Sequence, residues 1–357
     1  MIDFTIKYEE NLDEKKWNEF IEDTEKRSLF STIEYYKLLK AKIFFIIAYD
    51  KNGSIAGGTI CRIRGSLFPF SIFSKSLWIE SGLLVRHSFR DKEKQIKTDL
   101  LKCVEKKARA INCTLINFNH WSREQEVEIF SNNNFKIVPN FTFLSDLSVS
   151  QEELFGKLDH KIRPSLKKAK NNNLNFNLVY NDGVNFISDF YNLYELTQKR
   201  AIKTNRNSTM TLKSREFIYG ILQTENLNCY LSYVTYNDKL AAGSILVKMG
   251  ETIIIYIAAS DDEMNRNVGA SSFLFWENIL WAKNHGFKYL DFGGVPNNPV
   301  PENPAYGVYR FKKRFGGELT QFIIGRKVLA PFRAKVLKMI LNMRYIVRVV
   351  MKFSDNF

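Results

Sequence analysis

One segment of the chain has the residue types needed to bind an anionic group. Residues 306–318 contain four cations, four aromatic side chains and three glycines. In an extended or turning segment, side chains alternate between two faces. The aromatic residues that would point inward are Tyr309, Phe311 and Phe315. Arg310, Lys312 and Arg314 would then form a cationic wall against the ligand, although a solvated basic edge strand is the structural alternative.

A carboxylate and two glycines lie shortly before this cationic segment. Residues 290–296 form a predicted buried strand that reaches Gly293 and Gly294 and then enters a loop rich in proline and asparagine. The two glycines would allow close approach to the backbone. Asp291 could accept a proton from an amine, or it could only cap the loop.

Together, the two motifs resemble those of the Fem peptidyltransferases. Asp291-Phe-Gly-Gly294 is followed by Tyr309-Arg-Phe-Lys312 and by Phe315-Gly-Gly317. Members of this family use aminoacyl-tRNA to add amino acids to the peptide of cell-wall precursors, and the resemblance covers nearly the whole chain. It implies acyl transfer to an amine more strongly than it implies one acceptor, since some relatives with this ending occur in polysaccharide pathways.

The resemblance assigns roles to residues of both motifs. Lys312 would stabilise negative charge at the reacting carbonyl or at the terminal tRNA phosphate, with Phe311 as the adjacent wall; a surface ion pair is the alternative for Lys312. Aminoacyl transfer requires no nucleophilic residue. No residue stands out as the general base, and a substrate phosphate could take that part. The predicted catalytic residues are Lys312, Phe311 and Asp291, and the predicted substrate-binding residues of these motifs are Gly293, Gly294, Tyr309 and Arg310.

Two other segments supply cations that could bind substrate phosphates. Residues 32–40 resemble an N-terminal family segment whose lysine contacts the diphosphate of the precursor, and either Lys37 or Lys40 could be the equivalent. Residues 200–206 resemble the substrate-binding arginine segment of the family but are one residue shorter. Arg206 is the predicted substrate-binding residue there, with a loop salt bridge as the alternative.

The densest cation cluster lies in residues 160–170. Pro164 stands where a helix could begin. The resemblance includes a similar basic helix, and phosphate contacts from it would make tRNA binding depend steeply on salt. A solvated helix face is the alternative. The candidate tRNA-binding residues are Lys161, Arg163, Lys167 and Lys168.

One structural unit occurs twice along the chain. Each copy has a predicted β-hairpin, at residues 43–60 and 230–247, because turn residues separate two runs of β-branched and aromatic residues. In each copy a helix and a strand follow, and the helices are predicted at residues 92–110 and 270–285. This order resembles the GNAT acetyltransferase fold.

We therefore predict an α/β (α+β) protein with two tandem GNAT-like domains, each a mixed twisted sheet flanked by helices. The predicted boundaries are 1–148 for the first domain, 149–330 for the second, and 331–357 for a basic amphipathic C-terminal helix. Apolar residues mixed with evenly spread cations in this last segment could lie on an anionic membrane; packing onto the protein body is the alternative.

A second donor is suggested by residues 266–271. Arg266-Asn-Val-Gly269-Ala-Ser271 nearly matches the loop with which GNAT enzymes hold the pyrophosphate of coenzyme A at a helix start. The alternative is that Gly269 only permits tight entry into the helix. An acyl-CoA-dependent N-acyltransferase acting on an amino sugar of an envelope polysaccharide is therefore a rival function.

Composition narrows the choice of partners and of compartment. The chain has 357 residues and a formal net charge of +14, which suggests an anionic partner, although an AT-rich genome also gives such a composition. The four cysteines form no CxxC pair, so we expect no metal site. The N-terminus lacks a signal-peptide pattern, and no apolar stretch is long enough to span a bilayer.

The leading prediction is an aminoacyltransferase that moves an amino acid from aminoacyl-tRNA to an amine of a cell-wall (peptidoglycan-type) precursor. The precursor would be nucleotide- or lipid-linked, and aminoacyl-tRNA would be a co-substrate, so no cofactor is expected. We expect a cytoplasmic monomer that contacts the inner face of the membrane. A non-catalytic protein that binds tRNA or an anionic glycan is the alternative of another class.

Overall fold

The chain forms two compact units that exchange segments. The computed structural model describes residues 4–25, 27–65, 71–122, 127–181, 185–204 and 212–340. The first unit comprises Met1–Glu25, Lys40–Pro139 and Ile323–Phe357, and the second comprises Lys26–Leu39 and Asn140–Phe322. These units differ from the predicted continuous ranges 1–148 and 149–330, because strands rather than loops carry the chain from one unit to the other.

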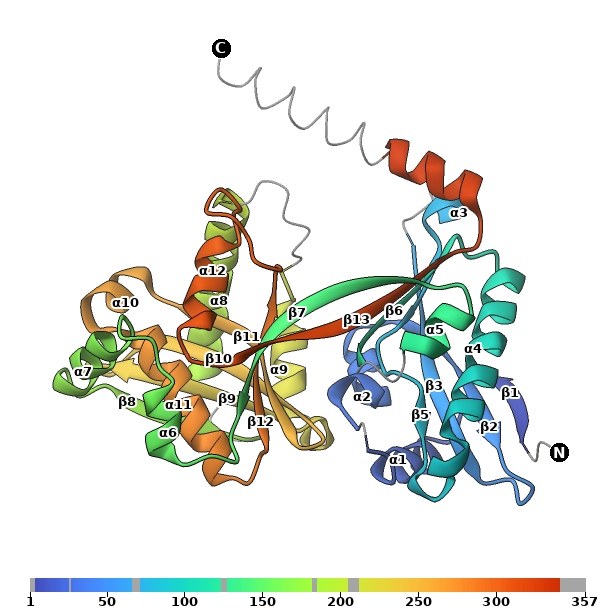
Figure 1. Cartoon of the computed structure of the whole chain (residues 1–357), viewed down its shortest axis with the longest axis horizontal. Helices are drawn as coiled ribbons and strands as arrows, with labels where there is room; N and C mark the ends of the chain where they lie inside the picture. Colours follow the sequence, from blue (N-terminus) through green and yellow to red (C-terminus); the bar gives the residue numbers. More distant parts are fainter. Residues whose placement is uncertain are drawn as a thin grey trace, which may run out of the picture. The chain divides into compact units, whose positions relative to one another are not determined.

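The first unit is a mixed sheet covered by helices (Figure 1). Its strands, in spatial order, are β1 (Thr5–Glu9), β2 (Lys42–Tyr49), β3 (Ile55–Arg64), β4 (Ser76–Ile79), β6 (Leu115–Ser122) and the second part of β13 (Glu318–Val328), with β5 (Leu84–Val85) paired to β3. Only β4 and β6 are parallel among the neighbouring pairs described. The helices are α1 (Glu14–Glu22), α3 (Ser71–Ser74), α4 (Glu93–Ala110) and α5 (Val127–Asn132).

The second unit repeats this plan. From one side of its sheet to the other, the strands are the second part of β7 (Lys136–Asp146), then β12 (Tyr289–Val295), β11 (Thr252–Ser260), β10 (Lys239–Met249), β9 (Cys229–Tyr236) and β8 (Asn175–Val179). β11 and β12 run parallel and the other pairs antiparallel. The helices are α2 (Ile33–Leu38), α6 (Gln151–Gly156), α7 (Arg163–Asn171), α8 (Asn185–Thr204), α9 (Arg215–Gln223), α10 (Asp262–Val268), α11 (Ala270–Asn284) and α12 (Tyr306–Lys313).

The predicted repeat is confirmed at the level of elements. Hairpin β2–β3 precedes α4 and β6 in the first unit, and hairpin β9–β10 precedes β11, α11 and β12 in the second (Figure 1). α4 packs on β2 and β3, while α11 packs on β9 and β10. In α4, apolar residues at helical spacing face the core, including Ile96, Leu100 and Val104.

The cationic segment is a helix, so the prediction of an extended or turning conformation is wrong. Asn303 opens the turn before α12, because its side chain accepts a hydrogen bond from the Ala305 backbone N–H and its carbonyl accepts one from Tyr306. Residues three apart share a face of a helix. Lys312 therefore lies on the same side as the buried Tyr309, rather than opposite to it, while Arg310 is exposed.

Candidate functional site

A β-bulge in β12 shapes the backbone after Asp291. Asp291 is opposite Leu144 of β7, whereas Gly294 is opposite Thr142, so β12 has one extra residue between these pairs. A bulge re-aims the side chains and carbonyls next to it. Gly293 lies inside the bulge at φ +78°, and a Cβ atom there would come within 2.9 Å of the Ile255 carbonyl oxygen. The sequence needs glycine at this position for both reasons.

The bulge surrounds the Asp291 carboxylate with hydrogen-bond donors. Asp291 is 2% exposed. Its Oδ1 atom accepts hydrogen bonds from the Thr142 hydroxyl at 2.5 Å and from the Gly293 backbone N–H at 2.7 Å. The Thr142 oxygen is also 3.1 Å from the Gly293 carbonyl oxygen. This buried carboxylate is held in place by two strands.

Lys312 of α12 binds the outer side of the same bulge. Its Nζ atom donates to the Gly293 carbonyl at 3.0 Å and to the Gly294 carbonyl at 3.3 Å. An ammonium group carries three hydrogens. Within the residues that the structure describes, Lys312 has no third acceptor.

Burial brings the pKa values of these two groups toward neutrality. It raises the pKa of Asp291 to about 6, against the opposing effects of the Thr142 and Gly293 hydrogen bonds and of the Lys312 charge. It lowers the pKa of Lys312 to about 8, against the opposing Asp291 charge. Between these values the two side chains form a charged pair, and either can exchange a proton near neutral pH.

Aromatic residues fix α12 to the body of its unit. The Phe311 ring packs edge-on against Phe275, and the buried Tyr309 ring packs against Phe143. The Tyr309 hydroxyl donates to the Asn298 side chain at 2.8 Å. Both rings thus contact the protein itself, which gives them a part in positioning Lys312.

The other predicted cations lie outside this cluster. Lys37 is an exposed residue of α2 in the second unit, whereas Lys40 is exposed in the first unit. The two candidates are therefore distinguished by the unit to which each belongs. Arg206 lies outside the described residues.

The predicted basic helix is confirmed as α7, with Pro164 in its first turn. Leu166 and Ala169 are buried and the four candidate tRNA-binding residues are exposed. Two of those four contact the protein: the Arg163 guanidinium donates to the Gly156 carbonyl at 3.0 Å, and Lys168 donates to the Arg266 carbonyl at 3.1 Å.

The possible pyrophosphate loop is closely covered by α7. Gly269 ends α10 and begins α11 at φ +76°, and a Cβ atom there would lie 2.6 Å from the Ser165 carbonyl oxygen. The Ser271 backbone N–H donates to the Asn265 side chain at 3.1 Å. The start of α11 therefore has little room for a phosphate, and the Ser271 N–H is already used. These two facts do not favour binding of acyl-CoA there.

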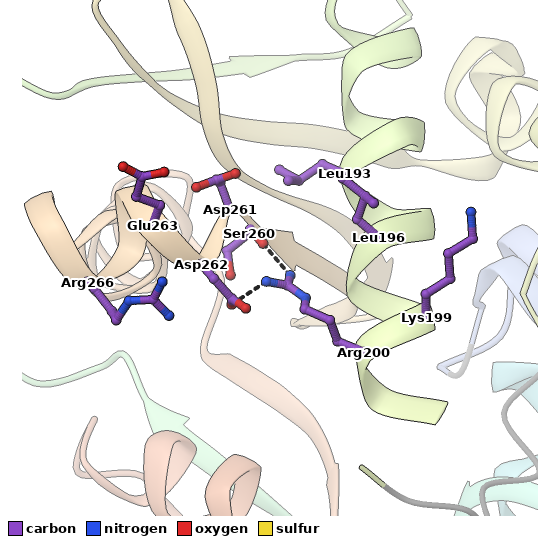
Figure 2. Close-up of a pocket in the computed structure, with 9 residues that line it drawn as sticks. All are labelled: Leu193, Leu196, Lys199, Arg200, Ser260, Asp261, Asp262, Glu263 and Arg266. Atoms are coloured by element: carbon purple, nitrogen blue, oxygen red, sulfur yellow. Dashed lines mark hydrogen bonds and ion pairs between the residues drawn. The ribbon is translucent and has the colours of Figure 1, made fainter. Parts of the chain in front are cut away.

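A pocket of about 410 Å³ lies between α8, the end of β11 and α10. Figure 2 shows that Arg200 reaches from α8 toward Ser260 and Asp262, whereas Lys199 points away from them. The Arg200 guanidinium donates to the Ser260 carbonyl and pairs with the Asp262 carboxylate. The lining carries three cations and three carboxylates, namely Lys199, Arg200, Arg266, Asp261, Asp262 and Glu263.

Sequence reasoning did not identify Thr142 or this pocket. Thr142 is 149 positions before its partner Asp291, and a threonine in a strand carries no signal of such a contact. In the part of the chain that the structure describes, there is no group of three or more His, Cys, Asp and Glu residues that could hold a metal ion. No helix among the described residues has the length and apolar character to cross a bilayer.

The sequence comparisons identify relatives over part of the chain. Residues 225–338 match the FemAB family. A lipid II:glycine glycyltransferase of Staphylococcus haemolyticus (strain JCSC1435) is 27% identical over 138 residues, which are 37% of this chain and 30% of that protein. The match thus spans less than a third of this curated relative. These findings confirm the predicted resemblance to FemABX-like proteins.

The structural comparisons extend over nearly the whole chain. The crystal structure of FemX gives a TM-score of 0.72 at 13% identity, covering 92% of this chain and 99% of that chain. A tandem GNAT protein from the clavulanic acid biosynthesis pathway gives a TM-score of 0.52 at 10% identity, covering 91% and 98%. At such identities the comparison shows the fold alone, and it confirms the predicted tandem GNAT-like architecture.

Proposed function

We propose that this FemABX-like chain is an aminoacyltransferase that moves an amino acid from aminoacyl-tRNA to an amine of a nucleotide- or lipid-linked cell-wall precursor. The family match and the names of the curated relatives support transfer to such a precursor. Aminoacyl-tRNA as the donor is the part of the proposal that rests on the resemblance of the motifs.

One observation carries the proposal, namely the Lys312 ammonium held by two carbonyls at the Asp291 bulge. In the reaction, the acceptor nitrogen forms a bond to the ester carbonyl carbon, the bond to the ribose oxygen breaks, and the proton of the amine passes to that oxygen. Negative charge develops on the carbonyl oxygen before this bond breaks. The remaining N–H of Lys312 would stabilise that charge, or the terminal tRNA phosphate.

The proton path does not require Asp291 as the base. Asp291 is buried and its Oδ1 atom accepts two hydrogen bonds, and we assign its charge the role of raising the pKa of Lys312. In the proposed path, a phosphate of the substrate takes the proton from the amine and passes it to the ribose oxygen.

The outer parts of the substrates would meet the other exposed cations. The cations of α7 would bind tRNA phosphates, and Lys37 or Lys40, together with Arg206, would bind the diphosphate of the precursor. Residues 331–340 are helical and expose Phe332 and Met339 near Lys335 and Lys338. This pattern supports contact with an anionic membrane surface that holds a lipid-linked acceptor, and the protein would then act at the inner face of the membrane.

The test is transfer of radiolabelled amino acid from charged tRNA to lipid II or to its nucleotide-linked precursor. We expect label in the acceptor with the unmodified protein, and roughly 100- to 1,000-fold slower transfer with Lys312→Met, as for the loss of one oxyanion donor. Lys313→Met removes a neighbouring exposed cation and should transfer at nearly the normal rate. Acetyl transfer from acetyl-CoA without any transfer from tRNA would contradict the proposal.

A further inference from the structure

We propose that Thr142 is a positioning residue of this site, which acts through Asp291 and the Gly293 carbonyl to hold the Lys312 ammonium in place. This inference rests on the proposed function. It extends the site from the two sequence motifs to β7, a strand that neither motif includes.

The contacts form a continuous chain from β7 to α12. The Thr142 oxygen lies within hydrogen-bonding distance of both Asp291 Oδ1 and the Gly293 carbonyl oxygen, at 2.5 and 3.1 Å. That same carbonyl accepts a hydrogen bond from Lys312 at 3.0 Å. The residue after Thr142, Phe143, packs against Tyr309 of α12. β7 thus contacts the bulge and the helix that carries Lys312.

Burial makes the hydroxyl of Thr142 important. Thr142 is 2% exposed, as is Asp291. A buried carboxylate keeps its charge only where hydrogen bonds or an opposite charge compensate for lost water. Oδ1 of Asp291 accepts hydrogen bonds from the Thr142 hydroxyl and from the Gly293 backbone N–H. Removal of the hydroxyl takes away the first of these, so Asp291 would be neutral over a wider pH range.

A neutral Asp291 would change Lys312. The Asp291 charge raises the pKa of Lys312 against the effect of burial. Thr142 of β7 and the Ile255 carbonyl of β11, which lie against Gly293 beside Lys312, carry no charge. Loss of the carboxylate charge therefore lowers the pKa of Lys312, and the ammonium is lost at a lower pH.

Competitive acetylation measures this linkage without any substrate. Trace acetic anhydride reacts with neutral amines, so the labelling of each lysine against pH, read by peptide mass spectrometry, gives its pKa. We expect the Lys312 transition near pH 8 in the unmodified protein. Asp291→Asn should lower it by about 1–3 units, and Thr142→Val, which keeps the shape of the side chain, should lower it by less.

Two controls separate this effect from general damage. Thr142→Ser keeps the hydroxyl and should restore the transition, and the acetylation of the exposed Lys313 should be the same in all variants. If Thr142→Val does not fold, Asp291→Asn tests the same linkage from its other end. An unchanged Lys312 transition in the folded variants, or an equal change in the acetylation of Lys313, would overturn the inference.

The same variants in the transfer assay distinguish failure of this inference from failure of the proposed function. If Thr142 positions Lys312, Thr142→Val lowers kcat with little change in KM, and Thr142→Ser restores kcat. Transfer by the unmodified protein with no Lys312 shift in Thr142→Val overturns the role of Thr142 alone. No transfer from charged tRNA to any precursor by the unmodified protein overturns the proposed function, and with it a catalytic meaning for the linkage.

Discussion

At Asp291 and Lys312, burial and opposite charge act in opposing directions. Each side chain loses water, which disfavours its charged form, and each is partly compensated by the other and by backbone groups. Such a pair adds little to stability, since the cost of desolvation can exceed the attraction. A buried pair of this kind at a glycine bulge is typical of a site that binds or reacts.

From the raised pKa of Asp291 we predict how the free energy of unfolding depends on pH. Its pKa rises from 3.8 to about 6 on folding, so between these values the folded protein binds more protons than the unfolded chain. The free energy of unfolding contributed by this group therefore falls as pH rises from about 4 to about 6, by up to about 3 kcal/mol. Asp291→Asn removes this contribution.

Urea unfolding of both proteins across this pH range checks the prediction. Titration of the groups outside the Asp291–Lys312 pair is common to the two proteins. The difference between their free energies of unfolding therefore reports Asp291 together with any change at Lys312. Parallel stability curves for Asp291→Asn and the unmodified protein would show that the Asp291 pKa is not raised by folding.

At the scale of elements, the bulge in β12 and the helix α12 together define the position of Lys312. Gly293→Ala should destabilise the protein by about 1–3 kcal/mol. Alanine would have to adopt the left-handed backbone conformation of Gly293, and its Cβ atom would approach the Ile255 carbonyl. It should also weaken transfer by displacing Lys312. Thermal unfolding and the transfer assay measure the two effects.

Two other glycines serve as matched controls. Gly286 has a similar φ of +76° but no neighbour within 4 Å of a new Cβ atom, so Gly286→Ala reports the backbone strain alone. Gly307 lies in α12 with open space around it, and alanine there should be tolerated or stabilising. Equal losses for Gly293→Ala and Gly286→Ala would argue against close packing at the bulge.

The basic segment made of Lys161 and helix α7 gives a separate prediction about tRNA as the donor. Replacing Lys161 and Lys167 by alanine should weaken tRNA binding and should reduce the slope of log affinity against log salt by about 1–2. Filter binding at several salt concentrations measures both. The same net charge is removed from α4 by Lys102→Ala with Lys106→Ala, and this control should affect binding much less. Equal effects of the two pairs would indicate unspecific attraction to a protein of +14 charge.

At the scale of the whole molecule, the two units share strands rather than a linker. β7 and β13 each continue from one unit into the other. Thr142, Phe143 and Leu147 belong to the second unit although they lie before the predicted boundary at residue 148. A GNAT-like domain of this chain is therefore defined by its contacts and not by one continuous range.

A fragment of residues 149–357 tests this arrangement. It lacks the β7 partner of β12, and would expose the edge of that strand together with part of the core. We expect the fragment to aggregate or to unfold without cooperativity, whereas the full chain melts cooperatively by circular dichroism. A soluble fragment with a cooperative transition would show that β7 is dispensable to the second unit.

The sequence by itself determined the repeated elements and the residues of the two motifs. Hairpins such as β2–β3 and helices such as α4 follow from turn residues and apolar periodicity, which act over short stretches of chain. The resemblance of residues 291–294 and 309–317 to one family was equally visible, because those motifs are local.

Only the tertiary structure decided which way Lys312 points and which residues complete its site. Residues 309–312 alternate in a manner that fits a strand, but packing of Tyr309 on Phe143 accompanies a helix that turns Lys312 toward the bulge. Thr142 contacts Asp291 through the pairing of β7 with β12. Strand pairing joins residues that are distant in sequence, and the shifted pKa values follow from that burial.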